Sequence, residues 1–243
     1  MSGTARLAMW SGPRNISTAL MRSWENRSDT LVVDEPLYAH YLEVTGIDHP
    51  AREEVLAVGV TDWRSVVRDL LAPDPGFRVF YQKHMAHHLT PDIEHEWIYG
   101  LTNVLLIRDP REVIASYLRS RDQVTLDDIG LELQNQLYDE LTGQGAEPRI
   151  IDAGDFLRDP ERHLRGLCDL IGVEFEASML RWEPGPRDSD GVWAPHWYAA
   201  VWASTGFAPY RERAVDLEGQ PAELAEQSRP LYERLHARRW GAA

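Results

Sequence analysis

The sequence predicts an α/β protein in which helices cover both faces of a central parallel sheet, giving three layers. Short apolar segments alternate with segments of helical periodicity along most of the chain. The clearest strand segments, RLAMWS and NVLLI, contain few or no charged residues, as expected of strands that are buried on both faces. A polar turn and then a helical pattern follow each of these strands, which is the order of a βα unit.

The individual elements follow from the apolar spacing and from the turn residues. Residues 6–11 are expected to form a buried strand and residues 17–27 a helix, in which Leu20 and Trp24 lie on one face. A second strand over 30–36 ends at Pro36, because proline cannot donate to a strand ladder. The remaining expected elements are helices within 50–71, strands over 78–84 and 103–110, a helix from 112, a strand within 148–157, a helix over 160–172 that is capped by Gly172, and a helix near 222–238.

Composition limits the classes of protein to consider. The 243 residues, 43% of them hydrophobic, suffice for one α/β domain, and without a repeat or clear linker we expect a single domain over 1–243. The net charge of −14 disfavours nucleic acid and anionic membranes as partners, so a polyanion site would need individually placed Arg and Lys side chains. Cys168 is the single cysteine and is expected to be a buried thiol. With no signal-like or membrane-spanning apolar run, we expect a cytoplasmic protein.

The stretch SGPRNISTAL follows the first strand and opens the first helix. N–H groups at a helix start bind oxyanions, and Arg14, Ser17 and Thr18 add a guanidinium and two hydroxyls there. The stretch lacks the Gly-Lys pair of the motif G-x-x-x-x-G-K-[ST]. An ordinary capped turn, with Ser17 as the N-cap, is the alternative interpretation.

A second polar group ends the strand over 103–110. Arg108 follows the apolar run, and Ser116 comes eight residues later in the next helix. Because ligands gather at the carboxyl edge of a parallel sheet, Arg108 at this strand edge can face a second anion, and Ser116 can donate to a ligand that lies along the helix. Alternatively, Arg108 pairs with Asp109 or Glu112 and Ser116 only fills a helix face.

The two segments together resemble the phosphate loops of sulfotransferases that use 3′-phosphoadenylyl sulfate (PAPS). The patterns are PR-x-x-[ST]-T and, later, RDPR-x-x-x-x-S, and the resemblance extends over roughly residues 6–175. The chain is also similar to a bacterial sulfotransferase group in which SGPRNIST, DEP, QKH and RDPREVIASY occur together. The resemblance implies a P-loop-like fold, PAPS as sulfuryl donor and a small-molecule acceptor. It implies that the 5′-phosphosulfate lies on Pro13, Arg14, Asn15, Ile16, Ser17 and Thr18, and the 3′-phosphate on Arg108 and Ser116.

Sulfuryl transfer needs a cation near the leaving phosphate and a base for the acceptor proton. Arg14 is the first candidate for the cation and Lys83, at a strand end, the second. Glu35 resembles the base of some bacterial carbohydrate sulfotransferases, and His84 resembles the histidine of cytosolic ones; we favour Glu35. Arg187 lies where the family often places a late basic loop.

Three assignments stay open at this point. We expect no metal, because His84, His87 and His88 have no carboxylate partner at a recognised spacing. The tryptophans of the tail, 193, 197 and 202, suit helix packing first and an acceptor or adenine wall second. A nucleotide-dependent kinase on the same fold and a non-catalytic nucleotide-binding protein are the alternative functions, and the sequence assigns neither the acceptor nor the oligomeric state.

Overall fold

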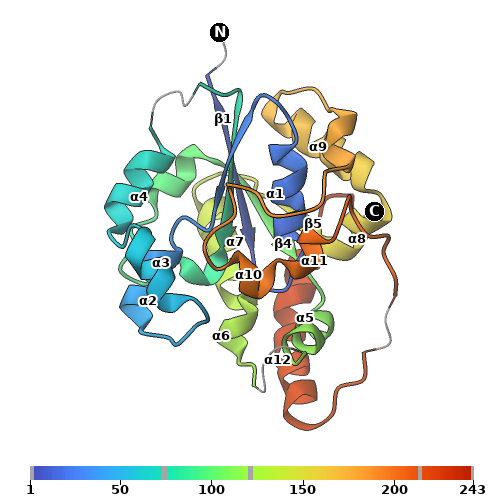
Figure 1. The fold of residues 1–243 in the computed structure, drawn as a ribbon. Helices are drawn as coiled ribbons and strands as arrows, with labels where there is room; N and C mark the ends of the chain where they lie inside the picture. The colour runs from blue at the N-terminus through green and yellow to red at the C-terminus, as the bar shows by residue number, and fades with distance from the viewer. Residues whose placement is uncertain (1–2, 73–75, 120–122, 213–214, 242–243) are drawn as a thin grey trace.

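The centre of the molecule is a five-stranded sheet in which every pairing is parallel, in the order β2-β3-β1-β4-β5 (Figure 1). This computed structural model describes residues 3–72, 76–119, 123–212 and 215–241. The parallel sheet predicted from the apolar strands is confirmed. The strands are β1 (Ala5–Ser11), β2 (Thr30–Asp34), β3 (Val79–Met85), β4 (Thr102–Ile107) and β5 (Arg149–Asp152).

Two apolar clusters separate the sheet from helices on its two faces. One cluster contains Leu7 and Met9 of β1, and its helices are α1 (Ser17–Glu25), α8 (Ala153–Arg158) and α9 (Pro160–Ile171). The other contains Ala8 and Trp10, and its main helices are α4 (Trp63–Leu70), α5 (Pro110–Tyr117), α7 (Leu131–Gly143) and α12 (Gly219–His236). Because side chains alternate along β1, its neighbouring residues supply both cores.

A third apolar cluster joins distant parts of the chain beside the carboxyl end of β2. Tyr38 and Leu42 of α2 (Tyr38–Thr45) and Val55 of α3 (Arg52–Val58) pack there with Trp193 and Tyr198. The latter two flank α10 (Ala194–Trp197), and α11 (Ala199–Trp202) follows, so that both short helices lie across the lower end of the strands in Figure 1. The cluster thus holds a late segment of the chain over the strand ends.

Several elements differ from the sequence expectation. The helical region 50–71 is two helices, because α3 ends before Gly59 and α4 begins at a new N-cap, Asp62, whose carboxylate accepts from Ser65 N. The helices α2 and α7 were not predicted. The buried face of α7 carries amides, and Gln134 donates to the carbonyl oxygens of Trp10 and Leu106, each over 3.0 Å. Gly172 caps α9 in the left-handed conformation, as predicted.

The shorter helical elements complete the description. They are α6 (Leu126–Ile129) and three 3₁₀ turns, at Ala86–His88, Glu96–Gly100 and Ala177–Leu180. Gly12 of the first loop packs so closely on α6 that a Cβ there would lie 2.4 Å from the carbonyl oxygen of Ile129. Glycine at position 12 is therefore required for the loop to pass beneath α6.

Candidate functional site

A cavity of about 420 Å³ opens at the carboxyl ends of the strands. The loop between β1 and α1, the ends of β2 and β3, Arg108 after β4 and the last turn of α5 all contribute to it, and α10 and α11 form a further wall. Most of the residues singled out in the sequence are brought together here. They are Pro13, Arg14, Asn15, Ile16, Ser17, Thr18, Glu35, Lys83, Arg108 and Ser116.

The first loop is shaped by Asn15 and by an unusual backbone at Arg14. Asn15 donates from its amide to the carbonyl oxygen of Leu106 over 3.0 Å and accepts from Ile16 N over 2.8 Å. Arg14 has φ of 55°, a left-handed conformation that is uncommon outside glycine, whereas Ile16 has φ of −90°. Position 16 therefore needs no glycine.

The start of α1 is left open toward the cavity. Ile16, not Ser17, is the N-cap residue, and it provides no side-chain cap for the first turn. Ser17 and Thr18 of that turn line the cavity. The first N–H groups of a helix have no intrahelical partner and carry partial positive charge, so this end of α1 suits an anion.

Two guanidinium groups contact the hydroxyl of Ser116, and a third contacts the backbone of Arg14. Arg14 donates from Nε to Ser116 Oγ over 3.1 Å, and Arg119 donates to the same oxygen over 3.1 Å. Arg108 donates to the carbonyl oxygen of Arg14 over 2.6 Å and pairs with Glu112 at 2.8 Å. Burial lowers the pKa of Arg14, and the charges of Arg119 and Arg108 lower it further. In a protein of net charge −14, this concentration of positive charge indicates an anion site.

Arg119 was not among the residues that the sequence singled out. It lies three residues after Ser116, and that spacing places two side chains on the same side of a helix. The spacing of three residues from Ser116 was therefore the feature of the sequence that could have identified Arg119 as a site residue.

A buried polar group lies beside the arginines, at the ends of β2 and β3. Lys83 donates to Asp34 over 2.7 Å, to Glu35 over 2.5 Å and to the hydroxyl of Tyr198 over 2.9 Å. Tyr198 in turn donates to Asp34 over 2.6 Å. Burial raises the pKa of the Glu35 carboxyl, and Lys83 opposes that rise. The two carboxylates hold the pKa of Lys83 well above its usual value, although burial acts in the opposite direction.

Glu35 also has a strained backbone, with φ of 45°. Such conformations are costly in residues other than glycine and concentrate at functional sites. Arg14 and Glu35 are two of the three non-glycine residues with positive φ in the described chain, and both line the cavity. The strain supports a functional role for both residues.

His84 lies away from the cavity, contrary to the expectation that it faces an acceptor. Its ring stacks on Trp10 with 4.2 Å between ring centroids, and its Nε2 lies 3.2 Å from Gln82 Oε1. β3 continues to Met85, so Lys83 and His84 are consecutive strand residues whose side chains point to opposite faces of the sheet. Burial and the charge of Lys83 lower the pKa of His84 to about 3.

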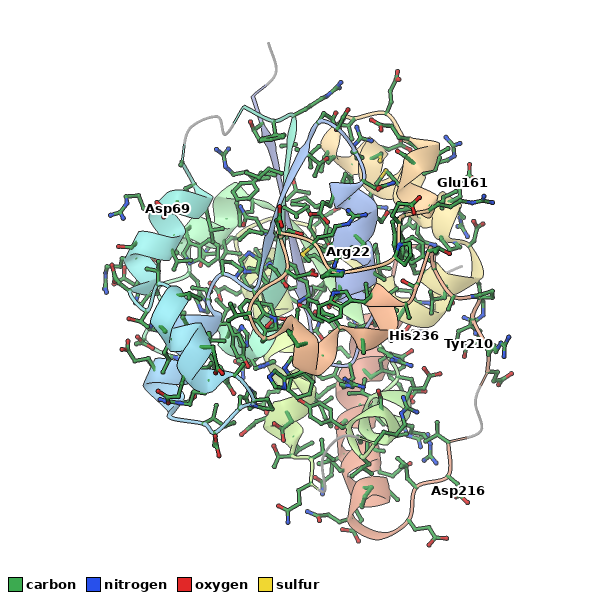
Figure 2. The ribbon with its side chains drawn as sticks, viewed as in Figure 1. Arg22, Asp69, Glu161, Tyr210, Asp216 and His236 are labelled. Carbon is green, nitrogen blue, oxygen red and sulfur yellow. The ribbon has the colours of Figure 1, made fainter. Side chains whose placement is uncertain are left out.

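Arg187 does not line the cavity either. Its guanidinium pairs with Glu25 of α1 at 2.8 Å, and its backbone N–H donates to Asp190 over 2.9 Å. Asp190 also pairs with Arg22 of α1, a side chain that is 1% exposed and that lies within the molecule in Figure 2. Arg187 therefore helps to attach the tail to α1 rather than facing a nucleotide.

The tail tryptophans divide between the two roles considered. Trp193 and Trp197 line the cavity, and Trp193 donates to the hydroxyl of Tyr198 over 3.2 Å. Trp202 instead donates to Asp190 over 2.9 Å. Two of the three thus belong to the cavity wall and the third to the attachment of the tail.

Two further features of the described residues concern metal binding and membrane insertion. Asp152, Asp155 and His236 present atoms within 4.8 Å of one another, outside the cavity lining. Tyr232 donates to Asp152, and Arg239 donates to Asp155, so ordinary protein contacts account for both carboxylates. No helix in the described ranges is both long enough and apolar enough to span a bilayer.

The fold and the open helix start define an α/β protein of the P-loop-like class, as the sequence predicted. The chain belongs to the sulfotransferase domain family, whose model matches residues 5–239. The resemblance inferred from the two loop motifs is therefore confirmed over nearly the whole chain.

Known proteins similar to the chain fall into two groups. Two proteins of Arabidopsis thaliana, branched-chain-amino-acid aminotransferase-like proteins 1 and 2, are 39% and 38% identical over 94% and 92% of this chain. The aligned region is 41% and 40% of their own lengths, so this chain corresponds to only part of each.

Solved structures share the fold at low identity. The sulfotransferase domain from the curacin biosynthetic pathway has a TM-score of 0.55 and 18% identity, with 92% of this chain and 97% of that chain covered. A sulfotransferase from Alicyclobacillus acidocaldarius has a TM-score of 0.57 and 14% identity, with 98% of each chain covered.

Proposed function

We propose that this chain transfers a sulfuryl group from PAPS to a hydroxyl or amine of a small-molecule acceptor. The observation that carries the proposal is the hydrogen bond between Arg14 and Ser116, which joins the first loop to α5 within one cavity. The two motifs of the sequence are therefore parts of a single site, and a donor with two separate anionic groups fits such a site.

The residues around the cavity fit this donor. Around Ser116, the guanidinium groups of Arg108 and Arg119 outnumber the single carboxylate of Glu112, and this excess of positive charge suits a 3′-phosphate. The open start of α1, with Arg14 beside it, suits a 5′-phosphosulfate. The cavity of about 420 Å³ lies in the range of sites for small molecules and cofactors, roughly 300–1,000 Å³. When bound, PAPS supplies the sulfuryl group, with adenosine 3′,5′-bisphosphate as its leaving group.

Glu35 is the proposed base for the acceptor proton. Its carboxylate lines the cavity, and its raised pKa makes it a stronger base than an exposed glutamate. Lys83 lies 2.5 Å from Glu35 and fixes its position. His84 is not proposed for this step, because its ring is enclosed against Trp10 on the other face of the sheet.

Arg14 is the proposed cation for the charge that develops on the leaving phosphate. Lys83, the other candidate, is already neutralised by Asp34 and Glu35. Arg14 lines the cavity, donates to the neutral hydroxyl of Ser116 and lies near the charges of Arg119 and Arg108. Positioned charge of this kind is the main source of catalysis in group transfer between oxyanions.

Transfer can be tested without knowing the acceptor. The chain is incubated with ³⁵S-labelled PAPS and a metabolite extract, and labelled products are identified by mass spectrometry. We expect a labelled product that requires the active chain and is reduced at least about a hundredfold with Glu35→Gln. If the extract yields labelled product equally with the chain and with its Arg14→Ala variant, the proposal is wrong.

A further inference from the structure

The end of the cavity beside Glu35 has aromatic walls. We define the aromatic end by Tyr38, His88, Trp193, Trp197 and Tyr198, all of which line the cavity. The Tyr38 ring stacks on His88 with 4.8 Å between centroids and meets Trp193 edge-on at 5.0 Å. Trp193 contacts Tyr198, which contacts Lys83, so these rings continue directly from the proposed base.

His88 is an uncharged polar group within this end. It is enclosed between the rings of Tyr38 and Tyr41, it is 2% exposed, and its Nδ1 has no hydrogen-bond partner among the described residues. Burial, together with the neighbouring His87 and Lys83, lowers the pKa of His88 well below its usual value. A neutral imidazole can contact an uncharged ligand but provides no charge to hold an anion.

The charges at this end favour an uncharged acceptor. Its cation, Lys83, is paired with both Asp34 and Glu35, which leaves an excess of negative charge when Glu35 is ionised and able to act as a base. Arg108 and Arg119 belong to the other end, because they follow β4, which is separated from β2 by β3 and β1, so that the two strand ends are roughly 14 Å apart at the usual strand spacing. Arg14 follows β1, and its charge is matched by the phosphosulfate of the proposed donor. An anionic acceptor would therefore meet Glu35 without a counter-charge, at a cost.

We propose that the aromatic end binds an uncharged hydroxyl compound with a flat ring, and that it discriminates against acceptors that carry a carboxylate. This inference rests on the proposed function. The ring lies among the aromatic side chains and the hydroxyl faces Glu35. The acceptor oxygen forms a bond to sulfur, the bond between sulfur and the leaving phosphate oxygen breaks, and the acceptor proton passes to Glu35. An amine is disfavoured because Glu35 stabilises its protonated form, which has no free electron pair.

The test is calorimetry with three probes of similar size. 4-Methylphenol, 4-hydroxybenzoate and 1-pentanol are titrated into the free chain and into the chain saturated with adenosine 3′,5′-bisphosphate. We expect 4-methylphenol to bind at least about tenfold more tightly than 4-hydroxybenzoate, which adds a charge, and than 1-pentanol, which lacks the ring. Glu35→Gln should strengthen binding of 4-hydroxybenzoate and change that of 4-methylphenol little.

The outcomes separate the two proposals. If the bisphosphate binds but 4-hydroxybenzoate binds as well as 4-methylphenol, or if no probe binds, the acceptor inference is wrong and the donor proposal stands. If the bisphosphate does not bind, the donor proposal fails, and the titrations of the free chain still decide whether the aromatic end distinguishes the probes. Unchanged discrimination in Glu35→Gln would also overturn the charge argument.

Discussion

Arg14 donates a hydrogen bond to Ser116 over 3.1 Å, and the two residues are 102 positions apart in the sequence. Arg119 donates to the same oxygen from the turn that follows α5. Both acceptor positions of the hydroxyl are used, and its own proton has no acceptor among the described residues, so it can be donated to a ligand anion. The contacts of Ser116 thus join the first loop and α5 in one site, and its hydroxyl can donate a hydrogen bond to the 3′-phosphate that we propose to bind there.

The first prediction concerns recognition of the 3′-phosphate. Arg119→Ala and Ser116→Ala should each lower the preference for adenosine 3′,5′-bisphosphate over adenosine 5′-monophosphate at least about tenfold, because each removes a donor to that phosphate. Isothermal titration calorimetry measures the ratio of the two dissociation constants. Arg64→Ala is the matched control, since Arg64 is 63% exposed and pairs with the equally exposed Glu94. An unchanged ratio in both site variants would contradict the assignment.

The second prediction concerns the pH dependence of transfer. Glu35 must be ionised to act as a base, and its pKa is raised by burial, so kcat should increase with pH through a value above that of an ordinary glutamate. Glu35→Gln should lower kcat about a hundredfold or more and leave bisphosphate binding within about twofold. A full pH–rate profile tests this. A profile that rises through the ordinary glutamate range, near 4.5, would argue against Glu35 as the base.

The third prediction concerns the buried histidine of β3. The pKa of His84 is about 3 in the folded chain against 6.5 for an ordinary histidine, so between these values the unfolded chain binds the extra proton. The neutral ring therefore contributes stability above pH 6.5 that is lost as pH falls toward 3. In His84→Gln, the free energy of unfolding should decrease less between pH 7 and 5 than in the parent.

Urea unfolding at several pH values provides that measurement. His196→Gln is the matched control for the substitution itself, because His196 is exposed. Equal slopes in His84→Gln and the parent would mean that His84 is charged or accessible in the folded chain.

The fourth prediction concerns attachment of the tail to α1. Arg22 and Asp190 are buried partners, with side chains 1% and 5% exposed and 2.5 Å between Nη2 and Oδ2. Asp190→Asn should lower the free energy of unfolding by about 3 kcal/mol, because it leaves the buried guanidinium of Arg22 with only the partly exposed Glu25, 3.2 Å away, as a counter-charge. Arg165→Ala is the control, since it breaks an exposed pair with Glu161, which lies at the periphery in Figure 2, and a contact with the Phe175 ring, and should cost about 1 kcal/mol or less.

Chemical unfolding of the two variants and the parent compares these costs directly. A loss for Asp190→Asn no larger than that for Arg165→Ala would show that the tail is not held by this pair.

The sequence predicted the sheet well because its strands are apolar and its helices amphipathic. Most of the site residues selected from the sequence do line the cavity, since the ends of parallel strands meet at one edge. It missed α7 because the buried amides of that helix, such as Gln134, resemble surface residues in the sequence.

The candidate site was harder to predict where geometry decides. Lys83 and His84 both looked like strand-end residues, and only the extension of β3 to Met85 places them on opposite faces. The long-range ion pair of Arg187 with Glu25 could not be read from spacing. The left-handed backbone of Arg14 and Glu35 is imposed by the surrounding structure, because neither residue favours it.

The measurement closest to the central claim is calorimetric titration of the chain with adenosine 3′,5′-bisphosphate, adenosine 5′-monophosphate and ATP with magnesium. A sulfotransferase site built on Arg14, Arg108, Ser116 and Arg119 should bind the bisphosphate most tightly, by at least about tenfold over the monophosphate. Tight binding of ATP with magnesium, and none of the bisphosphate, would contradict the account.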